Sequence, residues 1–113
     1  MFFTGLTTTF LKEFFYDLWF TFPLLLSLAA IITVLGQIVA RKEGWSRFDG
    51  FYWAFVTATT VGYGDIRPVK RTSKLLAILI ALTGLTFTGI LVAAAVHAAT
   101  LALAAHDATI KVR

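Results

Sequence analysis

Two long apolar runs divide the chain, with a shorter mixed segment between them. The first run, Leu18 to Ala40, contains 23 residues and no charged side chain. The second, Leu75 to Ala105, contains 31 residues, and His97 is its one ionisable residue. A helix of about 20 apolar residues crosses the hydrocarbon core of a bilayer, which is about 30 Å thick. The pattern therefore predicts two spanning helices, and the second is long enough to tilt or to extend beyond the bilayer.

The segment before the first run has two faces when it is drawn as a helix. Its polar face carries Lys12, Glu13, Tyr16 and Asp17, and the opposite face is apolar and aromatic. This pattern predicts an interfacial helix over residues 1–17, lying on the membrane before an outer helix over 18–40. The alternative is that the outer helix simply begins earlier.

The segment between the runs has an aromatic half and a polar half. Residues 48–59 are apolar but too short to cross a bilayer, and such a run is typical of a buried or re-entrant helix. Residues 60–65 read TVGYGD, in which Gly62 and Gly64 flank Tyr63. Glycine readily adopts positive φ, so normal and mirror conformations can alternate and point successive carbonyl groups the same way. A line of carbonyl oxygens can replace the hydration shell of a hard cation.

Composition and charge favour a membrane protein. Hydrophobic residues make up 58% of the 113 residues and charged residues only 14%, whereas about 25% are charged in soluble domains. The net charge of +4 comes from side chains that flank the apolar runs, so no nucleic-acid partner is expected. The chain has no cysteine, which excludes thiolate metal sites. No nucleophile–base pair or phosphate-binding glycine loop is recognisable, so we expect neither enzymatic activity nor a cofactor.

The sequence TATTVGYGD, Thr57 to Asp65, resembles the signature of potassium channels, whose TVGYG loops are the standard example of a carbonyl-lined filter. The order of span, short helix, filter and span is similar to that of prokaryotic potassium channels with two transmembrane helices, roughly from Leu18 to Ala105. The resemblance implies an all-α membrane protein with one pore domain over residues 1–113. Its parts would be a re-entrant pore helix (48–59), a selectivity filter (60–65) and an inner helix (73–106), assembled as a homotetramer in membrane lipid.

The resemblance also assigns the ion sites. It implies that K⁺, the permeant ion, binds the backbone carbonyls of the filter, and that the hydroxyl of Thr60 closes the inner end. The filter residues are Thr60, Val61, Gly62, Tyr63 and Gly64. The C-terminal end of the pore helix would add about −0.5 elementary charge near the pore axis. The expected function is passive and selective conduction of K⁺.

Residues around the filter are expected to support it. In the family the aromatic residue at the Trp53 position packs around the filter tyrosine, here Tyr63; the alternative is an ordinary aromatic belt at the membrane interface. Asp65 would lie at the outer mouth with Tyr52 as its partner. Some family members carry a glutamate where this chain has Val56, so slow inactivation that depends on such a carboxyl pair is not expected here.

The second apolar run is expected to carry the gate. Gly84 matches the hinge glycine of the family's inner helix and Gly89 is a second candidate, although small residues also serve close helix packing. Steps of three and four residues from Gly84 predict a cavity-lining stripe at Thr88, Val92 and Val96. His97 could place charge at the pore mouth when protonated, or it could be a neutral interfacial residue.

The distribution of Lys and Arg and the family resemblance predict opposite orientations in the membrane. Residues 41–74 contain seven Lys and Arg and the termini only three, so the positive-inside rule places the central segment in the cytoplasm. The resemblance implies the reverse, with both termini cytoplasmic in a multi-pass plasma-membrane protein. We follow the resemblance because it is more specific. In many relatives the inner helix leads into a ligand-sensing domain, so we expect one in the full-length protein. The rival functions are a weakly selective cation channel on this scaffold and a non-conducting membrane subunit.

Overall fold

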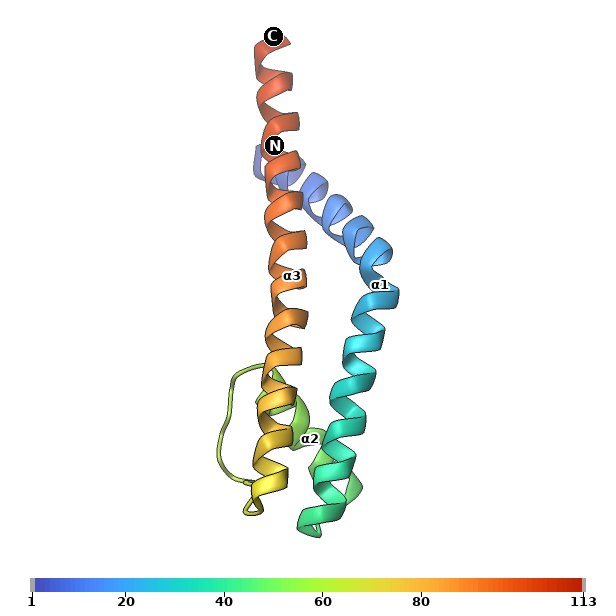
Figure 1. Ribbon diagram of the computed structural model, residues 1–113. Helices are drawn as coiled ribbons and strands as arrows, with labels where there is room; N and C mark the ends of the chain where they lie inside the picture. The colour runs from blue at the N-terminus through green and yellow to red at the C-terminus, as the bar shows by residue number, and fades with distance from the viewer. Residues whose placement is uncertain (1, 113) are drawn as a thin grey trace. The chain divides into compact units, whose positions relative to one another are not determined.

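The computed structural model describes the backbone of residues 2–112 and the side chains of residues 3–108. These residues form three helices, α1 (Phe2–Glu43), α2 (Arg47–Ala58) and α3 (Arg71–Val112), and no strand is found among them (Figure 1). The segments Phe3–Glu43 and Arg71–Ala108 are long and apolar enough to cross a membrane. The predicted all-α fold with two long apolar helices flanking a short one is confirmed.

Helix boundaries differ from the predicted ones in several places. α1 runs without a break through the predicted interfacial helix (1–17) and outer helix (18–40), with Pro23 inside it. Whether residues 1–17 lie on the membrane surface stays a prediction. α2 begins at Arg47 instead of 48 and ends at Ala58 instead of 59. α3 begins at Arg71 instead of 73 and continues beyond 106.

The chain divides into two compact units. The terminal unit comprises Met1–Pro23 and Gly89–Arg113, and the α2 unit comprises Leu24–Thr88. In the α2 unit, α2 follows the end of α1, and a loop returns from α2 to the start of α3 (Figure 1). The predicted pore helix and filter therefore both belong to the α2 unit.

Two glycines bring α1 and α2 into backbone contact in the α2 unit. A Cβ on Gly36 would lie 2.5 Å from the Cβ of Ala54 and 3.0 Å from the carbonyl oxygen of Gly50. A Cβ on Gly50 would lie 2.6 Å from the Cβ of Ala40. Small residues let helices approach closely in lipid, where no hydrophobic force drives them together. The buried core around this crossing consists of Ile32, Val39, Trp53, Ala54, Ala58 and Ile80.

A third glycine brings α3 against the C-terminal end of α2. Gly84 is buried, and a Cβ there would meet the carbonyl oxygen of Ala58 and lie 2.5 Å from its Cα. No side chain fits into this contact. Since Ala58 is the last residue of α2, the contact fixes the place from which the following loop departs.

In the terminal unit, small residues also form a buried stripe. Ala94, Ala98 and Ala102 recur at steps of four along α3 and are at most 7% exposed. Positions four residues apart lie on one face of a helix. The first part of α3 therefore uses glycine for close packing and the later part uses alanine.

Candidate functional site

The predicted filter begins directly after α2. The N-cap of α2 is Ser46, whose hydroxyl accepts a hydrogen bond from the backbone N–H of Asp49 at 3.1 Å. At the other end, the N–H of Thr59 donates to the carbonyl of Phe55 at 2.9 Å, which completes the last turn. The C-terminal end of α2, with its partial negative charge, thus lies at the start of the filter.

The backbone of the filter alternates in handedness. Thr60, Gly62 and Gly64 have φ angles of 65°, 56° and 79°. Thr60 is the one described non-glycine residue with positive φ, so Val61 and Tyr63 between them have ordinary values. Positive φ is strained for a β-branched residue, and such strain is concentrated at functional sites. The alternation expected from the two glycines is present, and Thr60 extends it by one residue.

The hydrogen bonds that the described residues make at the filter use its N–H groups as donors. The N–H of Thr60 donates to the carbonyl of Thr57 at 3.1 Å. The N–H groups of Val61 and Gly62 both donate to the carbonyl of Val56, at 3.1 and 3.2 Å. No hydrogen bond made by the described residues is accepted by the carbonyls of filter residues 60–63. The N–H groups of residues 60–62 are therefore bonded to α2, and the carbonyl oxygens of residues 60–63 are left for another ligand.

The two aromatic residues predicted to buttress the filter differ in burial. Trp53 is 5% exposed, and its ring packs edge-on against Trp45 with centroids 5.3 Å apart. Tyr63 is 71% exposed. Both line one cavity of about 240 Å³ beside the filter, together with Asp65. The packing of Trp53 around Tyr63 stays a prediction, because the ring partner that the structure shows for Trp53 is Trp45.

Tyr52 and Asp65 come together, as the sequence suggested. The hydrogen bond to the Asp65 carboxylate is the main cause that raises the pKa of the Tyr52 phenol above its usual value; burial and the Asp65 charge act in the same direction. This bond joins α2 to Asp65, the last residue of the predicted filter segment. Val56, which lies where some family members have glutamate, contributes through its backbone carbonyl instead.

Glu43 makes a contact that the sequence did not predict. Its Oε1 accepts hydrogen bonds from the N–H groups of Val69, at 2.7 Å, and Lys70, at 2.9 Å. The bonds join the last residue of α1 to the chain just before α3, 26 and 27 positions away. No local pattern signals such a distant pair.

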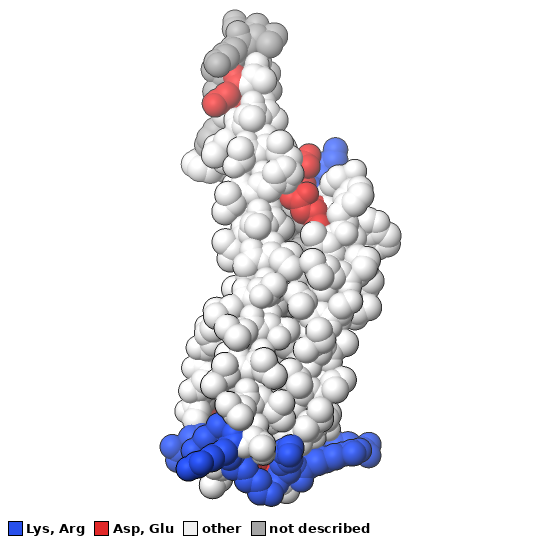
Figure 2. All heavy atoms as spheres, in the orientation of Figure 1, with Lys and Arg blue, Asp and Glu red and all other residues white. Residues whose placement is uncertain are grey.

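Arg67 was also missed. It lines the same cavity as Tyr63 and Asp65, and its Cδ is 3.9 Å from where a Cβ on Gly64 would lie. It is one of seven Lys and Arg in residues 41–74. Lys and Arg side chains gather at the end of the α2 unit where α1 ends and α3 begins (Figure 2).

The residues assigned to the gate lie on one unbroken helix. α3 continues through both Gly84 and Gly89. Gly84 contacts Ala58, whereas no atom lies within 4 Å of a Cβ built on Gly89. The packing explanation of Gly84 thus has direct support, and the hinge stays a prediction. The stripe residues Thr88, Val92 and Val96 are exposed in the single chain.

Comparisons with known proteins agree with this arrangement. A family model described as "Ion channel" matches residues 1–100. The chain is 38% identical over 66 residues to TWiK family of potassium channels protein 7 of Caenorhabditis elegans, covering 58% of this chain and 12% of that protein. It is 38% identical over 76 residues to the putative potassium channel protein YugO of Bacillus subtilis, covering 61% and 23%. A voltage-gated potassium channel of Aeropyrum pernix is 47% identical over 47 residues, covering 42% and 16%.

The similarities cover very different shares of the sequences compared. The matched stretch spans at most 23% of the length of these three relatives. No solved structure matches the chain. The family model, in contrast, covers α1, α2, the filter loop and most of α3. With two helices able to cross a bilayer, the chain is a membrane protein and belongs to this ion-channel family.

Proposed function

We propose that the chain forms the pore of a potassium-selective channel that conducts K⁺ passively. The observation that carries the proposal is the filter backbone: φ alternates from Thr60 to Gly64, the N–H groups of residues 60–62 are bonded to α2, and the carbonyls of residues 60–63 accept no hydrogen bond from the described residues. Oxygen dipoles held this way can replace the water around a dehydrated K⁺. The names of the relatives support the choice of ion.

The proposed assembly is a homotetramer. One filter supplies only one wall of a pathway, and cyclic symmetry closes a ring of identical walls. Exposed Val61 (52%) and Tyr63 (71%) supply apolar surface for neighbouring subunits to cover. Four α2 C-terminal ends facing one axis would favour a cation there without an acidic side chain.

The proposed roles fall into three groups: residues that bind the ion, residues that support the filter, and residues of the gate. Carbonyls of Thr60, Val61, Gly62 and Tyr63 bind K⁺, and Gly64 completes the filter. Trp53, Tyr52 and Asp65 support it from behind. Gly84, Gly89, Thr88, Val92 and Val96 form the hinge and the inner cavity. Because α3 contacts α2 at Gly84, bending there would also move the end of α2 that carries the filter.

The setting of the channel is part of the proposal. It would lie in the plasma membrane with both termini in the cytoplasm, in spite of the cations between the spans. A C-terminal ligand-sensing domain in the full-length protein is proposed from the family resemblance alone. No cofactor is required and no enzymatic activity is expected. Protease cleavage of a C-terminal tag from the outside of oriented vesicles would contradict the orientation.

The test is the reversal potential in bilayers with K⁺ on one side and Na⁺ on the other. A potassium-selective pore gives a reversal potential far toward the K⁺ equilibrium value. Gly62→Ala is expected to abolish selective current, because positive φ is costly for alanine. Gly44→Ala is the matched control: Gly44 has a φ of 75° but lies in the α1–α2 turn. It should weaken folding by about 1–2 kcal/mol and leave selectivity unchanged.

Each alternative has its own outcome in this experiment. A reversal potential near zero would identify a weakly selective cation channel on the same scaffold. A protein that reconstitutes as a folded oligomer but carries no current under any condition would be the non-conducting membrane subunit. Unchanged selectivity in Gly62→Ala would mean that the filter has been assigned to the wrong residues.

A further inference from the structure

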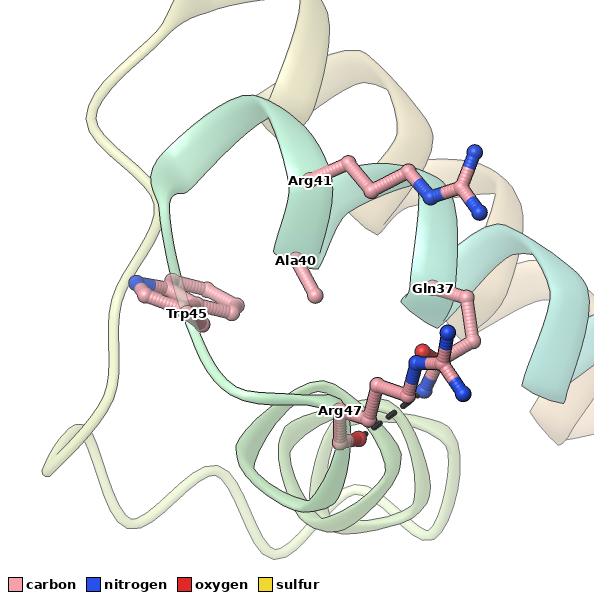
Figure 3. Close-up of a pocket in the computed structure, with 5 residues that line it drawn as sticks. All are labelled: Gln37, Ala40, Arg41, Trp45 and Arg47. Carbon is pink, nitrogen blue, oxygen red and sulfur yellow. Dashed lines mark hydrogen bonds between the residues drawn. The ribbon is translucent and has the colours of Figure 1, made fainter.

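A cavity of about 570 Å³ lies where α1 ends and α2 begins. It is lined by Gln37, Ala40, Arg41, Trp45 and Arg47 (Figure 3). Two arginines, a glutamine, a tryptophan and one small apolar residue thus line the space, and no carboxylate-bearing residue does. This composition suits an anion, and the proposed conduction pathway makes no use of it.

Hydrogen bonds fix the backbone on both sides of the cavity. The N–H of Trp45 donates to the carbonyl of Ala40 at 2.9 Å, closing the C-terminal end of α1 beyond Gly44. The side-chain amide of Gln37 donates to the carbonyl of Arg47 at 2.9 Å, joining α1 to the first residue of α2 (Figure 3). The Trp45 ring packs against Trp53 in the core. The two arginines therefore extend from fixed backbone, which lowers the entropic cost of holding a ligand.

The positive charge at the cavity is not neutralised by nearby side chains. Arg41 and Arg47 are exposed, and neither forms an ion pair with another described residue. Glu43, close to Arg41 in sequence, uses its Oε1 for the N–H groups of Val69 and Lys70. Asp49 lies in the first turn of α2 but does not line the cavity. The guanidinium groups of Arg41 and Arg47 lie on the same side as Gln37 (Figure 3).

We propose that this cavity binds a phosphate group, supplied either by the headgroup of an anionic phospholipid or by phosphate in solution. The planar guanidinium group matches phosphate with two parallel hydrogen bonds, and two such groups provide a clamp. Trp45 is suited to the membrane–water boundary, because tryptophan is enriched there. Basic pockets between helices on the cytoplasmic side of membranes bind anionic headgroups, and the same pairing of cationic side chains with phosphate is proposed here for the α1–α2 turn.

The surface of α1 next to the cavity can accommodate the rest of a lipid. Ile38 and Val34 lie three and seven residues before Arg41, on the same helical face, and are 40% and 58% exposed. An acyl chain attached to a phosphate at Arg41 would run along this face. The proposal is independent of conduction, because it needs only the folded α2 unit in a membrane or a detergent micelle.

The test is lipid binding by the purified protein in zwitterionic detergent, measured by native mass spectrometry. Wild-type protein should prefer phosphatidylglycerol over phosphatidylcholine with equal acyl chains. Arg41→Gln and Arg47→Gln should each reduce that preference about fivefold. Lys42→Gln is the matched control, because Lys42 is exposed but does not line the cavity. An equal loss in Lys42→Gln would overturn the site, because general charge would then explain binding.

A second arm separates the two sources of phosphate. Inorganic phosphate is titrated into lipid-free protein and followed by ³¹P line broadening. Saturable broadening that the arginine variants lose identifies phosphate in solution, whereas headgroup preference without such broadening identifies the lipid. Absence of both overturns the proposal. If the glutamine variants fail to fold, Arg41→Lys with Arg47→Lys replaces them, and binding as tight as wild type would contradict the two-bond clamp. Because no current is recorded, a negative result leaves the channel function untouched.

Discussion

The carboxylate of Asp17 on α1 lies 2.8 Å from the ring of His97 on α3, measured from Oδ2 to Nδ1. Both residues belong to the terminal unit. The pair accounts for a histidine in the second apolar run, because a polar group in apolar surroundings is costly unless it is hydrogen-bonded. The sequence suggested a pore-mouth charge or a neutral interfacial ring, and the structure adds a bond between two helices. A role of His97 in gating stays a prediction.

A double-mutant cycle measures the strength of this bond. Asp17→Ala and His97→Ala are combined, and thermal unfolding is followed in detergent. The histidine side chain is 59% exposed, so solvent screening limits the expected coupling to about 0.5–1 kcal/mol. Glu13→Ala, on the same polar face as Asp17, is the control and should show no coupling to His97→Ala. Zero coupling for the Asp17 pair would mean that the bond contributes nothing to stability.

Gly84 and Gly89 allow packing and hinge roles to be separated. Gly84→Ala is expected to destabilise the protein by about 1–3 kcal/mol, because the new Cβ would collide with the backbone of Ala58. Gly89→Ala meets no atom within 4 Å, so it should be neutral or stabilise α3 by up to about 1 kcal/mol. Thermal unfolding of both variants is the measurement.

The opposite outcome would favour the hinge. If Gly84→Ala leaves the unfolding temperature unchanged and lowers the open probability in bilayers, the glycine serves bending more than packing. A large loss of stability in Gly89→Ala would show that its open surroundings are covered by another subunit. The two variants differ by one methyl group each, so side-chain size does not confound the comparison.

The sequence predicted features that depend on neighbouring residues and missed those that depend on distant ones. The filter was recognisable because Gly62 and Gly64 determine local backbone geometry. The contact of Gly84 with Ala58 lies 26 positions apart, so the sequence could not choose between packing and hinge. Glu43 was missed for the same reason. The positive φ of Thr60 was unexpected, because β-branched residues disfavour it and hydrogen bonding to α2 must hold it.

The predicted boundary between an interfacial helix and an outer helix is absent from the structure for a different reason. Neither glycine nor proline lies within five residues of position 17, so the backbone gives no reason for a break there, and α1 is continuous. Only the membrane distinguishes a helix that lies on its surface from one that crosses it. The hydrophobic pattern therefore predicts helix on both sides of position 17, and a division into surface and spanning parts depends on the bilayer.

Glu43 is predicted to stabilise the segment that joins the filter to α3. Glu43→Ala removes the acceptor for the N–H groups of Val69 and Lys70, and two unpaired donors should loosen the segment between the filter and α3. The expected result is faster loss of current during sustained opening. Glu43→Gln keeps an oxygen acceptor but loses the charge, so its effect should be smaller. Equal current decay in wild type and Glu43→Ala would show that the turn does not support the filter.

Arg67 is predicted to lower the local K⁺ concentration at the Tyr63 end of the filter. It lines the cavity beside Tyr63 and Asp65, so a tetramer would carry four such charges around the mouth. Arg67→Gln should raise single-channel K⁺ conductance on the order of twofold to fivefold at low salt. The gain should disappear at high salt, because the screening length falls from about 30 Å at 0.01 M to about 3 Å at 1 M. Arg71→Gln, at the start of α3 and outside that cavity, is the control and should change conductance less. A gain that persists at high salt would point to a change in filter geometry instead of electrostatics.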